Sequence, residues 1–429
     1  MCGPGMGFSG MWKMNKEIVV IGGGAAGMMA AIAAAEQGAT VRLLEPNERL
    51  GKKLNITGKG RCNVTNNCTP EELMAHITRN GKFLYSAFNR FTSADAMAFF
   101  EGIGVPLKTE RGNRVFPVSD CAFDVSGALR QRMEKLGVRW EHDRAVSVRC
   151  REGAVCSVSG EKADYPARAV ILATGGVSYP GTGSTGDGYR MARELGHTIV
   201  EPHGSLVPLV SDDPCCGRMQ GLALKNVQLS ARNEKGKTVF SEFGEMLYTH
   251  FGVSGPLVLS ASAHLRGWDE HRYILSVDLK PALTEEKLEE RLLRELREQS
   301  NRNMENVLES LLPHSMIPVM CERLGIGPEL KANSLKKEQR RALEHELKHF
   351  DISVTGPRPV AEAIVTSGGV KVGEVNPNSM ESKKVRGLFF AGEILDVDAY
   401  TGGFNLQIAW STGRAAGLAA AEKEGEEEI

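Results

Sequence analysis

The chain has 429 residues, 41% of them hydrophobic and 24% charged, so it can form a full globular core and its length suggests two or three domains. Its formal net charge of −1 argues against a nucleic-acid partner and against a charged membrane surface. The nine cysteines are scattered and odd in number, which argues against a disulfide framework or zinc site and fits a reducing cytoplasm, and no apolar stretch reaches the length of a membrane span.

The first elements predict a strand, a helix and a second strand. Residues 1–15 lack the basic and apolar regions of a signal peptide, and we expect a disordered lead there. Glu17–Ile21 is a β-branched run typical of a buried parallel strand, and Ala25–Gln37 predicts a helix. Thr40–Leu44 predicts the next strand, which Glu45 closes. This order indicates the start of a βαβ domain.

The chain up to residue 198 then mixes a loop, helices and strands. Leu50–Asn67 is rich in Gly, Lys, Asn and Thr and predicts an irregular loop, followed by a helical zone that includes Ser93–Glu101. The other predicted elements are a helix at Asp124–Leu136, a hairpin of Val146–Cys150 and Val155–Ser159, a buried strand at Ala169–Ala173 and a helix at Asp187–Leu195.

From residue 199 the pattern changes, which indicates an inserted domain. Short alternating runs such as Val227–Ala231 and Ile274–Leu279 are typical of an antiparallel β domain. A buried strand at Leu388–Ala391 and a closing helix at Leu406–Ala421 then complete the first domain. The predicted domains are a dinucleotide domain of residues 16–198 and 368–429, an inserted β domain of residues 199–283 and 351–367, and a charged helical insert of residues 284–350.

The turn after the first strand, Gly22–Gly27, has the pattern GxGxxG. Alone this pattern is weak, but here it follows a strand, opens a helix and precedes an acidic strand end, Glu45. Gly22 permits the sharp turn, Gly24 lets the backbone approach a pyrophosphate, and Gly27 lets the helix pack on the strand. The helix N-terminus offers N–H groups to phosphates, and Glu45 can accept ribose hydroxyls. The turn therefore predicts a dinucleotide site.

A second GxGxxG match, Gly181–Gly186, stands several residues after its strand, with Tyr179 and Pro180 between. We interpret it as a loop that faces the ligand rather than as an independent NAD(P)H fingerprint. The segments that indicate a flavin are Gly387–Glu393 and Thr401–Asn405. A carboxylate after a buried strand suits a ribityl hydroxyl, and a Gly-Gly turn that opens the last helix can bring N–H groups to the flavin pyrimidine oxygen.

Three further motifs, Gly58–Asn66, Ala173–Gly176 and Thr249–Pro256, join these turns in a resemblance to one flavoprotein family. From about Lys16 onward the chain is similar to the aminoacetone-oxidase-like or BaiN-like NAD(P)/FAD-dependent oxidoreductases. The resemblance implies an α/β fold: a GR2-type FAD-binding Rossmann domain built from both chain ends, with an inserted antiparallel β-barrel-like domain and a small helical insert. It also implies tightly bound FAD.

The turns and motifs together predict the residues that hold the cofactor. These are Gly22, Gly24, Ala25, Ala26, Gly27, Glu45, Lys53, Gly60, Arg61, Cys62, Asn63, Thr174, Gly175, Gly392, Glu393, Gly402, Gly403, Phe404 and Asn405. Because a flavin carries the hydride step itself, the protein needs few catalytic groups. Tyr400 and Tyr179 are candidate proton donors and Cys62 is a candidate nucleophile, with plain packing as the alternative for all three.

Three functions remain open at this point. The first is NAD(P)H-dependent reduction of an enone or related small, steroid-like substrate, with NAD(P)H as a transient co-substrate of FAD. The second is an oxidase of an amine or aminoketone that uses oxygen, and the third is a non-catalytic flavin-binding redox module. We expect a small-molecule substrate, no metal, no nucleic acid, no membrane and a cytoplasmic location; the oligomeric state is open.

Overall fold

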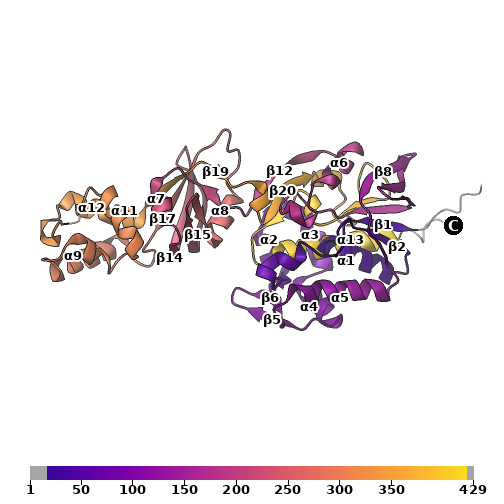
Figure 1. Ribbon diagram of the computed structural model, residues 1–429, viewed down its shortest axis with the longest axis horizontal. Coiled ribbons are helices and arrows are strands. Elements are labelled where there is room, and N and C mark those ends of the chain that lie inside the picture. The colour runs from indigo at the N-terminus through magenta and orange to yellow at the C-terminus, as the bar shows by residue number, and fades with distance from the viewer. Residues whose placement is uncertain (1–16, 328, 423–429) are drawn as a thin grey trace, which may run out of the picture. The chain divides into compact units, whose positions relative to one another are not determined.

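The computed structural model describes residues 17–327 and 329–422, so the predicted lead at residues 1–15 lies outside the described residues. The chain forms two units, one of residues up to 203 and from 365 onward, the other of residues 204–364. The indigo and yellow ends of the chain lie in the same unit (Figure 1). The second unit falls within the predicted limits of 199 and 367.

The first unit is built on a parallel sheet of five strands, and every neighbouring pair runs in the same direction. Its order is β21 (Leu388–Phe390), β11 (Ala169–Leu172), β1 (Ile18–Ile21), β2 (Val41–Leu44) and β7 (Arg139–Glu141). The central strands are buried along their whole length because elements cover both faces. The carboxyl ends of parallel strands meet at one edge, where α/β folds bind ligands. The predicted fold class is confirmed.

Helices α1 (Ala25–Glu36) and α13 (Phe404–Glu422), from opposite ends of the chain, pack side by side (Figure 1). They approach closely because α13 presents glycines to α1. A Cβ atom on Gly417 would lie only 2.3 Å from the carbonyl oxygen of Ala30. The remaining helices of this unit are α2 (Pro70–Ala75), α3 (Gly81–Arg90), α4 (Ser93–Gly102), α5 (Ala122–Lys135) and α6 (Asp187–Glu194).

Further small sheets surround this core. They are β8 (Ala145–Arg151), β9 (Ala154–Gly160) and β10 (Asp164–Pro166); β3 (Thr65–Asn66), β6 (Arg114–Pro117) and β5 (Leu107–Glu110); β4 (Ile77–Arg79) with β22 (Asp398–Ala399); and β12 (Ile199–Ser205) with β20 (Val365–Val370).

Two predictions of local structure were wrong. The predicted irregular loop Leu50–Asn67 contains a 3₁₀ helix, η1 (Leu54–Gly60), as well as β3, and the predicted helical zone contains strand β4. Both strands depend on distant partners, since β3 pairs with β6 and β4 pairs with β22 near the other end of the chain. Such pairing leaves no local period in the sequence.

The second unit contains a seven-stranded antiparallel sheet, and charged helices lie in sequence between its strands β17 (Tyr273–Asp278) and β18 (Phe350–Val354). The sheet order is β18, β17, β14 (Ala223–Asn233), β15 (Thr238–Thr249), β16 (Gly252–Ser254), β13 (Leu209–Val210) and β19 (Gly356–Pro357). Its helices are α7 (Pro214–Arg218), α8 (Pro256–Ser262), α9 (Glu285–Glu298), α10 (Met304–Leu308), α11 (Ile317–Arg323) and α12 (Lys337–Lys348). Within the described ranges, no helix has the length and apolarity needed to cross a membrane.

Candidate functional site

The first glycine turn links β1 to α1 at the carboxyl edge of the parallel sheet. The turn is tight, because a Cβ atom on Gly27 would lie 1.9 Å from the Gly22 carbonyl oxygen. No side chain caps α1, so its first-turn N–H groups keep their donors for another acceptor. A Cβ atom on Gly24 would meet nothing within 4 Å. The helix end therefore faces open space with free donors, which is what a pyrophosphate requires.

Glu45, at the end of β2, lies against this turn. One carboxylate oxygen accepts the Gly23 N–H at 2.7 Å, and the other accepts both the backbone and the side-chain N–H of Asn47, at 2.9 and 2.7 Å. The backbone N–H of Gly23 and the Asn47 N–H groups thus hold the carboxylate beside the predicted phosphate position. Its place beside the turn is the one that the dinucleotide fingerprint requires for a group that accepts ribose hydroxyls.

Lys53 and Glu393, which come from opposite ends of the chain, form an ion pair shortly after the end of β21. Lys53 Nζ donates to Glu393 Oε2 and to Ser178 Oγ, both at 2.7 Å, and Glu393 Oε1 also accepts the Thr366 N–H at 2.7 Å. Burial alone would raise the pKa of Glu393, but the charge and hydrogen bonds of Lys53, with those of Thr366 and Ser178, lower the pKa overall. The carboxylate is therefore ionised and can accept hydrogen bonds from hydroxyl groups.

Two buried polar atoms of the predicted cofactor-binding residues have no hydrogen-bond partner among the described residues: Asn63 Oδ1 and Thr174 Oγ1. A buried polar group without a partner costs roughly 1–3 kcal/mol, so each is expected to bind something polar. Asn63 follows η1, and Thr174 follows β11, two residues from Gly176. These atoms, with the open space above Gly24, fit a polar dinucleotide such as FAD in this region.

The last glycine turn, Thr401–Gly403, opens α13 and is held on one side by β3. Gly403 has φ +99°, and a Cβ atom there would lie 2.4 Å from the Thr65 backbone. Asn66 Nδ2 donates to the carbonyl oxygens of Gly402 and Gly112, at 3.0 and 3.1 Å. Asn405, in the first turn of α13, pairs with the backbone of Ala399 through both its amide nitrogen and oxygen. The turn is therefore clamped in one conformation.

His76 holds the other side of the same turn, and the sequence analysis did not single it out. Its ring stacks on Phe404 with centroids 4.2 Å apart and planes at 11°, and it meets the Tyr400 ring edge-on at 6.2 Å. Its carbonyl oxygen accepts the Tyr400 N–H at 3.1 Å. No direct signal in the sequence points to His76. Strand β4, which follows it, and strand β22, which precedes Tyr400, pair only in the folded chain.

The candidate catalytic residues lie in different environments. Cys62 is completely buried, and burial raises its pKa to about 12, so at neutral pH it is a packed thiol rather than a thiolate nucleophile. Tyr179 is 37% exposed at the start of the 3₁₀ helix η2 (Pro180–Thr182). Tyr400 is half-buried beside His76. The second GxGxxG segment ends at Gly186, the residue that precedes α6.

Arg61 was predicted to contact the cofactor, but its guanidinium is engaged elsewhere. Its Nη2 lies 2.5 Å from Glu110 Oε1 and 2.6 Å from Asp120 Oδ1, and the group stacks 4.1 Å over the Phe116 ring. These partners belong to β5, to β6 and to the segment that follows β6. The hydrogen bonds to Glu110 and Asp120 raise the pKa of Arg61. Its cationic charge is therefore matched by carboxylates of the hairpin.

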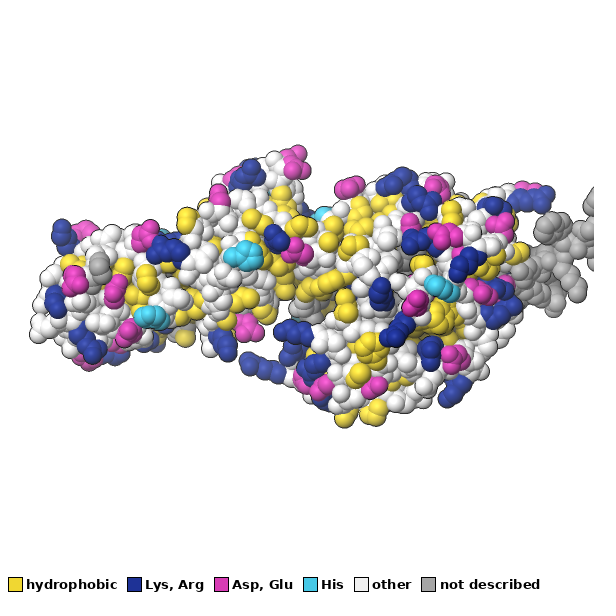
Figure 2. Space-filling view, viewed as in Figure 1, with side chains coloured by type: hydrophobic (Ala, Val, Ile, Leu, Met, Phe, Trp, Pro, Cys, Tyr) yellow, Lys and Arg dark blue, Asp and Glu magenta, His cyan; other side chains and the backbone are white. Residues whose placement is uncertain are grey.

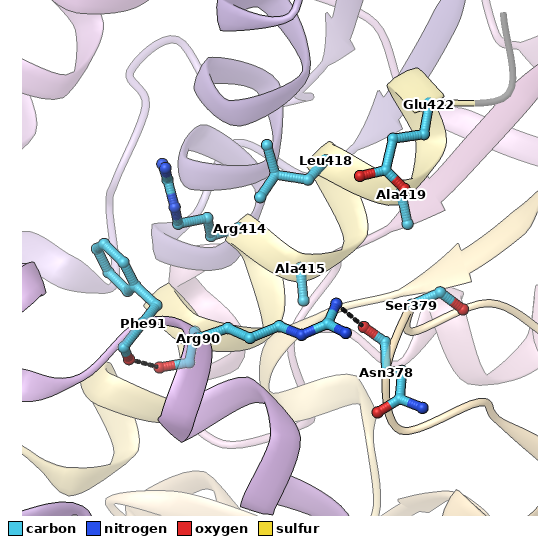
Figure 3. A pocket seen from close by; sticks show the side chains of 10 residues that line it. Arg90, Phe91, Asn378, Ser379, Arg414, Ala415, Leu418, Ala419 and Glu422 are labelled. Carbon is cyan, nitrogen blue, oxygen red and sulfur yellow. Dashed lines mark hydrogen bonds between the residues drawn. The ribbon is translucent and has the colours of Figure 1, made fainter. Parts of the chain in front are cut away.

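A separate cavity of about 260 Å³ lies along the later part of α13, beyond the turn-bearing end (Figure 3). Arg90 reaches across it toward the carbonyl oxygen of Asn378, at 3.4 Å. The lining is Arg90, Phe91, Asn378, Ser379, Ser411, Arg414, Ala415, Leu418, Ala419 and Glu422. Because α13 begins at the glycine turn, this cavity is distinct from the candidate cofactor region.

Two further observations concern possible metal ligands and the distribution of surface charge. No group of three or more His, Cys, Asp or Glu side chains in residues 17–327 and 329–422 is placed to hold a metal ion. On the visible face, Lys and Arg side chains are interspersed with Asp and Glu (Figure 2).

Comparison with known proteins gives consistent results. The family model described as "HI0933-like protein Rossmann domain" matches residues 16–419. The chain is 33% identical over 421 residues to a 3-dehydro-bile acid delta(4,6)-reductase of Clostridium scindens, covering 96% of this chain and all of that one. It is 31% identical over 396 residues to a ribosomal RNA dihydrouridine synthase of Escherichia coli, covering 92% and 96%.

Among solved structures, the chain is similar to a 3-ketosteroid-delta4-(5alpha)-dehydrogenase of Rhodococcus jostii RHA1. The TM-score is 0.54 at 17% identity, over 96% of this chain and 99% of that one. An open flavocytochrome c3 fumarate reductase gives a TM-score of 0.51 at 18% identity, over 96% and 79%. At these identities the likeness concerns the fold.

Proposed function

The chain belongs to the HI0933-like Rossmann-domain family and is an FAD-dependent oxidoreductase, and from this premise we propose that it reduces a carbon–carbon double bond conjugated to a carbonyl group, with NAD(P)H as the electron donor. FAD, when bound, would accept hydride from NAD(P)H and deliver it to the substrate. The chain's own part is to hold the cofactor, position the substrate and exchange a proton.

One observation carries this proposal: relatives that are named for different substrates act on the same kind of bond, a carbon–carbon double bond conjugated to a carbonyl group. A delta(4,6)-reductase of a 3-dehydro bile acid acts on double bonds in conjugation with the 3-oxo group. A dihydrouridine synthase reduces the uracil ring bond, which is conjugated to the C4 carbonyl. Both align with nearly the whole of this chain, so the shared step is the best estimate of its reaction.

The cradle supports the cofactor part of the proposal. The open donors of α1 would bind the pyrophosphate, and Glu45 would accept adenosine ribose hydroxyls. Glu393, ionised and paired with Lys53, would accept a ribityl hydroxyl. The clamped Gly402–Gly403 turn would direct the N–H groups at the start of α13 toward the flavin pyrimidine oxygen, where they stabilise negative charge.

An anaerobic experiment tests the reaction class. The purified yellow protein is mixed with NADH or NADPH, and we expect the flavin absorbance to bleach. Addition of a conjugated enone, such as a 3-oxo-Δ4 steroid, should then restore the absorbance, whereas the corresponding saturated ketone should not. Bleaching only by an amine, with peroxide formed when air is admitted, would overturn the reductase and favour the oxidase.

The same assay separates two substrate classes. An unmodified ribosomal RNA transcript replaces the steroid, and mass spectrometry follows the gain of two hydrogens on uridine. We favour the steroid-like enone because the net charge of −1 provides little general attraction for RNA. The absence of a nucleic-acid partner stays a prediction, since two relatives are named for ribosomal RNA. Turnover of the transcript but not of the enone would reverse the choice.

A further inference from the structure

His76 has a fixed ring orientation and an open second nitrogen. Its Nδ1 lies 2.7 Å from the carbonyl oxygen of Glu72, one turn earlier in α2. Because a carbonyl oxygen can only accept, Nδ1 must carry a proton, so in the neutral ring Nε2 holds the lone pair. Within the described part of the chain, no hydrogen bond or ion pair occupies Nε2. The ring is half-buried, so solvent can exchange protons with it.

The ring is held at the predicted flavin end by its neighbours. The parallel stack on Phe404 fixes its plane, and the hydrogen bond from the Tyr400 N–H to the His76 carbonyl fixes its backbone. The nearby carboxylate of Glu72 accepts the Thr69 N–H at 2.8 Å in the N-cap of α2. The side chains in ring contact with His76 are thus Tyr400, which is titratable, and Phe404, which is uncharged.

We propose that His76 is the acid that supplies the proton in the reduction, an inference that rests on the proposed function. Hydride, with both electrons from NAD(P)H, goes to the β-carbon of the substrate. The imidazolium of His76 gives the Nε2 proton to the α-carbon, the double bond becomes a single bond, and solvent reprotonates the ring. The balance is NAD(P)H, a proton and the unsaturated substrate in, NAD(P)⁺ and the saturated substrate out.

The other candidate acids in this region are less suited to the task. A general acid is most effective when its pKa lies near the working pH. Burial raises the pKa of Cys62 to about 12, and a tyrosine ordinarily has a pKa near 10, about three units above neutrality. A histidine side chain ordinarily changes charge in the neutral range. In addition, His76 shares the turn with Tyr400 and Phe404, whereas Cys62 lies inside the core.

The test uses the two half-reactions of the intact holoenzyme. His76→Phe keeps an aromatic ring on Phe404 but removes both nitrogens, and His76→Gln keeps hydrogen-bonding groups without the ring. His345→Phe, at an exposed position of α12, is the matched control. We expect reoxidation by the enone to be slowed at least about 100-fold in the two His76 variants, and bleaching by NAD(P)H to be slowed far less, least in His76→Phe, which keeps the ring stack on Phe404. His345→Phe should match the wild type in both half-reactions.

Two further readouts separate acid catalysis from support of the turn. Reoxidation by the enone should depend on pH in the wild type, and His76→Phe should lose this dependence. Nitrogen NMR of the substrate-free protein should show Nδ1 protonated and Nε2 bare in the neutral ring.

His76→Phe reoxidised at the wild-type rate would overturn the inference and leave the proposed function intact. Loss of FAD content, with both half-reactions slowed equally, would assign His76 to support of the turn and also overturn the inference. A wild type that no enone or RNA reoxidises would overturn the proposed function.

Discussion

The two glycine turns that open α1 and α13 are built in different ways. The first turn is closed chiefly by close backbone contact, with Gly27 against the Gly22 carbonyl, and the Glu45 side chain accepts a glycine N–H. The second depends on side chains from elsewhere in the chain, chiefly Asn66 and His76. The first turn is therefore rigid by sterics, and the second is rigid only when distant strands are in place. Each difference predicts a different response to substitution.

The largest effect is expected where sterics close the first turn. Gly27→Val places a Cβ atom 1.9 Å from the Gly22 carbonyl oxygen, and backbone cannot move aside as a side chain can. We expect a loss of at least about 3 kcal/mol of unfolding free energy, a large part of the stability of a typical domain. Denaturant unfolding, or failure to express soluble protein, would show it. Wild-type stability with full FAD content would contradict the packing described here.

Gly24 separates binding from folding in the same turn. Gly24→Ala adds a methyl group where nothing lies within 4 Å, so we expect an unchanged Tm of the apoprotein. The methyl group points into the proposed pyrophosphate position, and we expect the Kd for FAD to rise about tenfold, which corresponds to about 1.4 kcal/mol. Fluorescence titration with FAD measures it. Gly127→Ala, in α5 with equally open space, is the matched control, and an equal effect there would remove the special role of Gly24.

In the second turn, the Asn66 side chain holds the conformation that close backbone contact holds in the first turn. Asn66→Ala removes the hydrogen bonds to the carbonyl oxygens of Gly402 and Gly112, and we expect a cost of roughly 1–3 kcal/mol because both acceptors lose a buried donor. FAD should dissociate faster, as the turn loses its fixed conformation. Stopped-flow dilution measures the rate, and Asn67→Ala, at the exposed next residue, is the control. An FAD off-rate equal to that of the control would show that β3 does not hold the turn.

This contrast also explains what the sequence could predict. Gly22–Gly27 and Glu45 follow local rules of strand, turn and helix, so the first turn was predicted from the pattern alone, whereas the full fold class was implied by the family resemblance. The clamp on the second turn was not predicted, because β3 and β4 are two and three residues long and have no local period. Arg61 shows a different limit: its charge was visible in the sequence, but Glu110 and Asp120, which engage it, were assigned to no element. His76 was missed because its partners, Tyr400 and Phe404, lie at the other end of the chain.

The last prediction concerns the ion pair that joins the two halves of the cradle, Lys53 with Glu393. The pKa of Glu393 is lowered in the folded protein, since Lys53 and the hydrogen bonds outweigh burial. A carboxyl group whose folded pKa is depressed contributes stability above its unfolded pKa, near 4.3, and loses that contribution as pH falls through the lower folded value. Lys53→Met leaves the carboxylate largely buried without its cation, which raises its pKa.

We therefore expect Lys53→Met to cost about 1–2 kcal/mol at pH 7, a value reduced because both side chains are about one-fifth exposed. The difference from wild type should shrink as pH falls and disappear below the lowered pKa of Glu393 in the folded wild type, where the carboxyl group is protonated in both proteins. Denaturant unfolding of the apoproteins between pH 3 and 8 measures it, with Lys52→Met at the exposed neighbouring position as the control. A loss of unfolding free energy that is the same at pH 3 and pH 7 would mean that Lys53 stabilises the protein by packing its aliphatic chain. The two halves of the cradle would then be joined by contact rather than by charge.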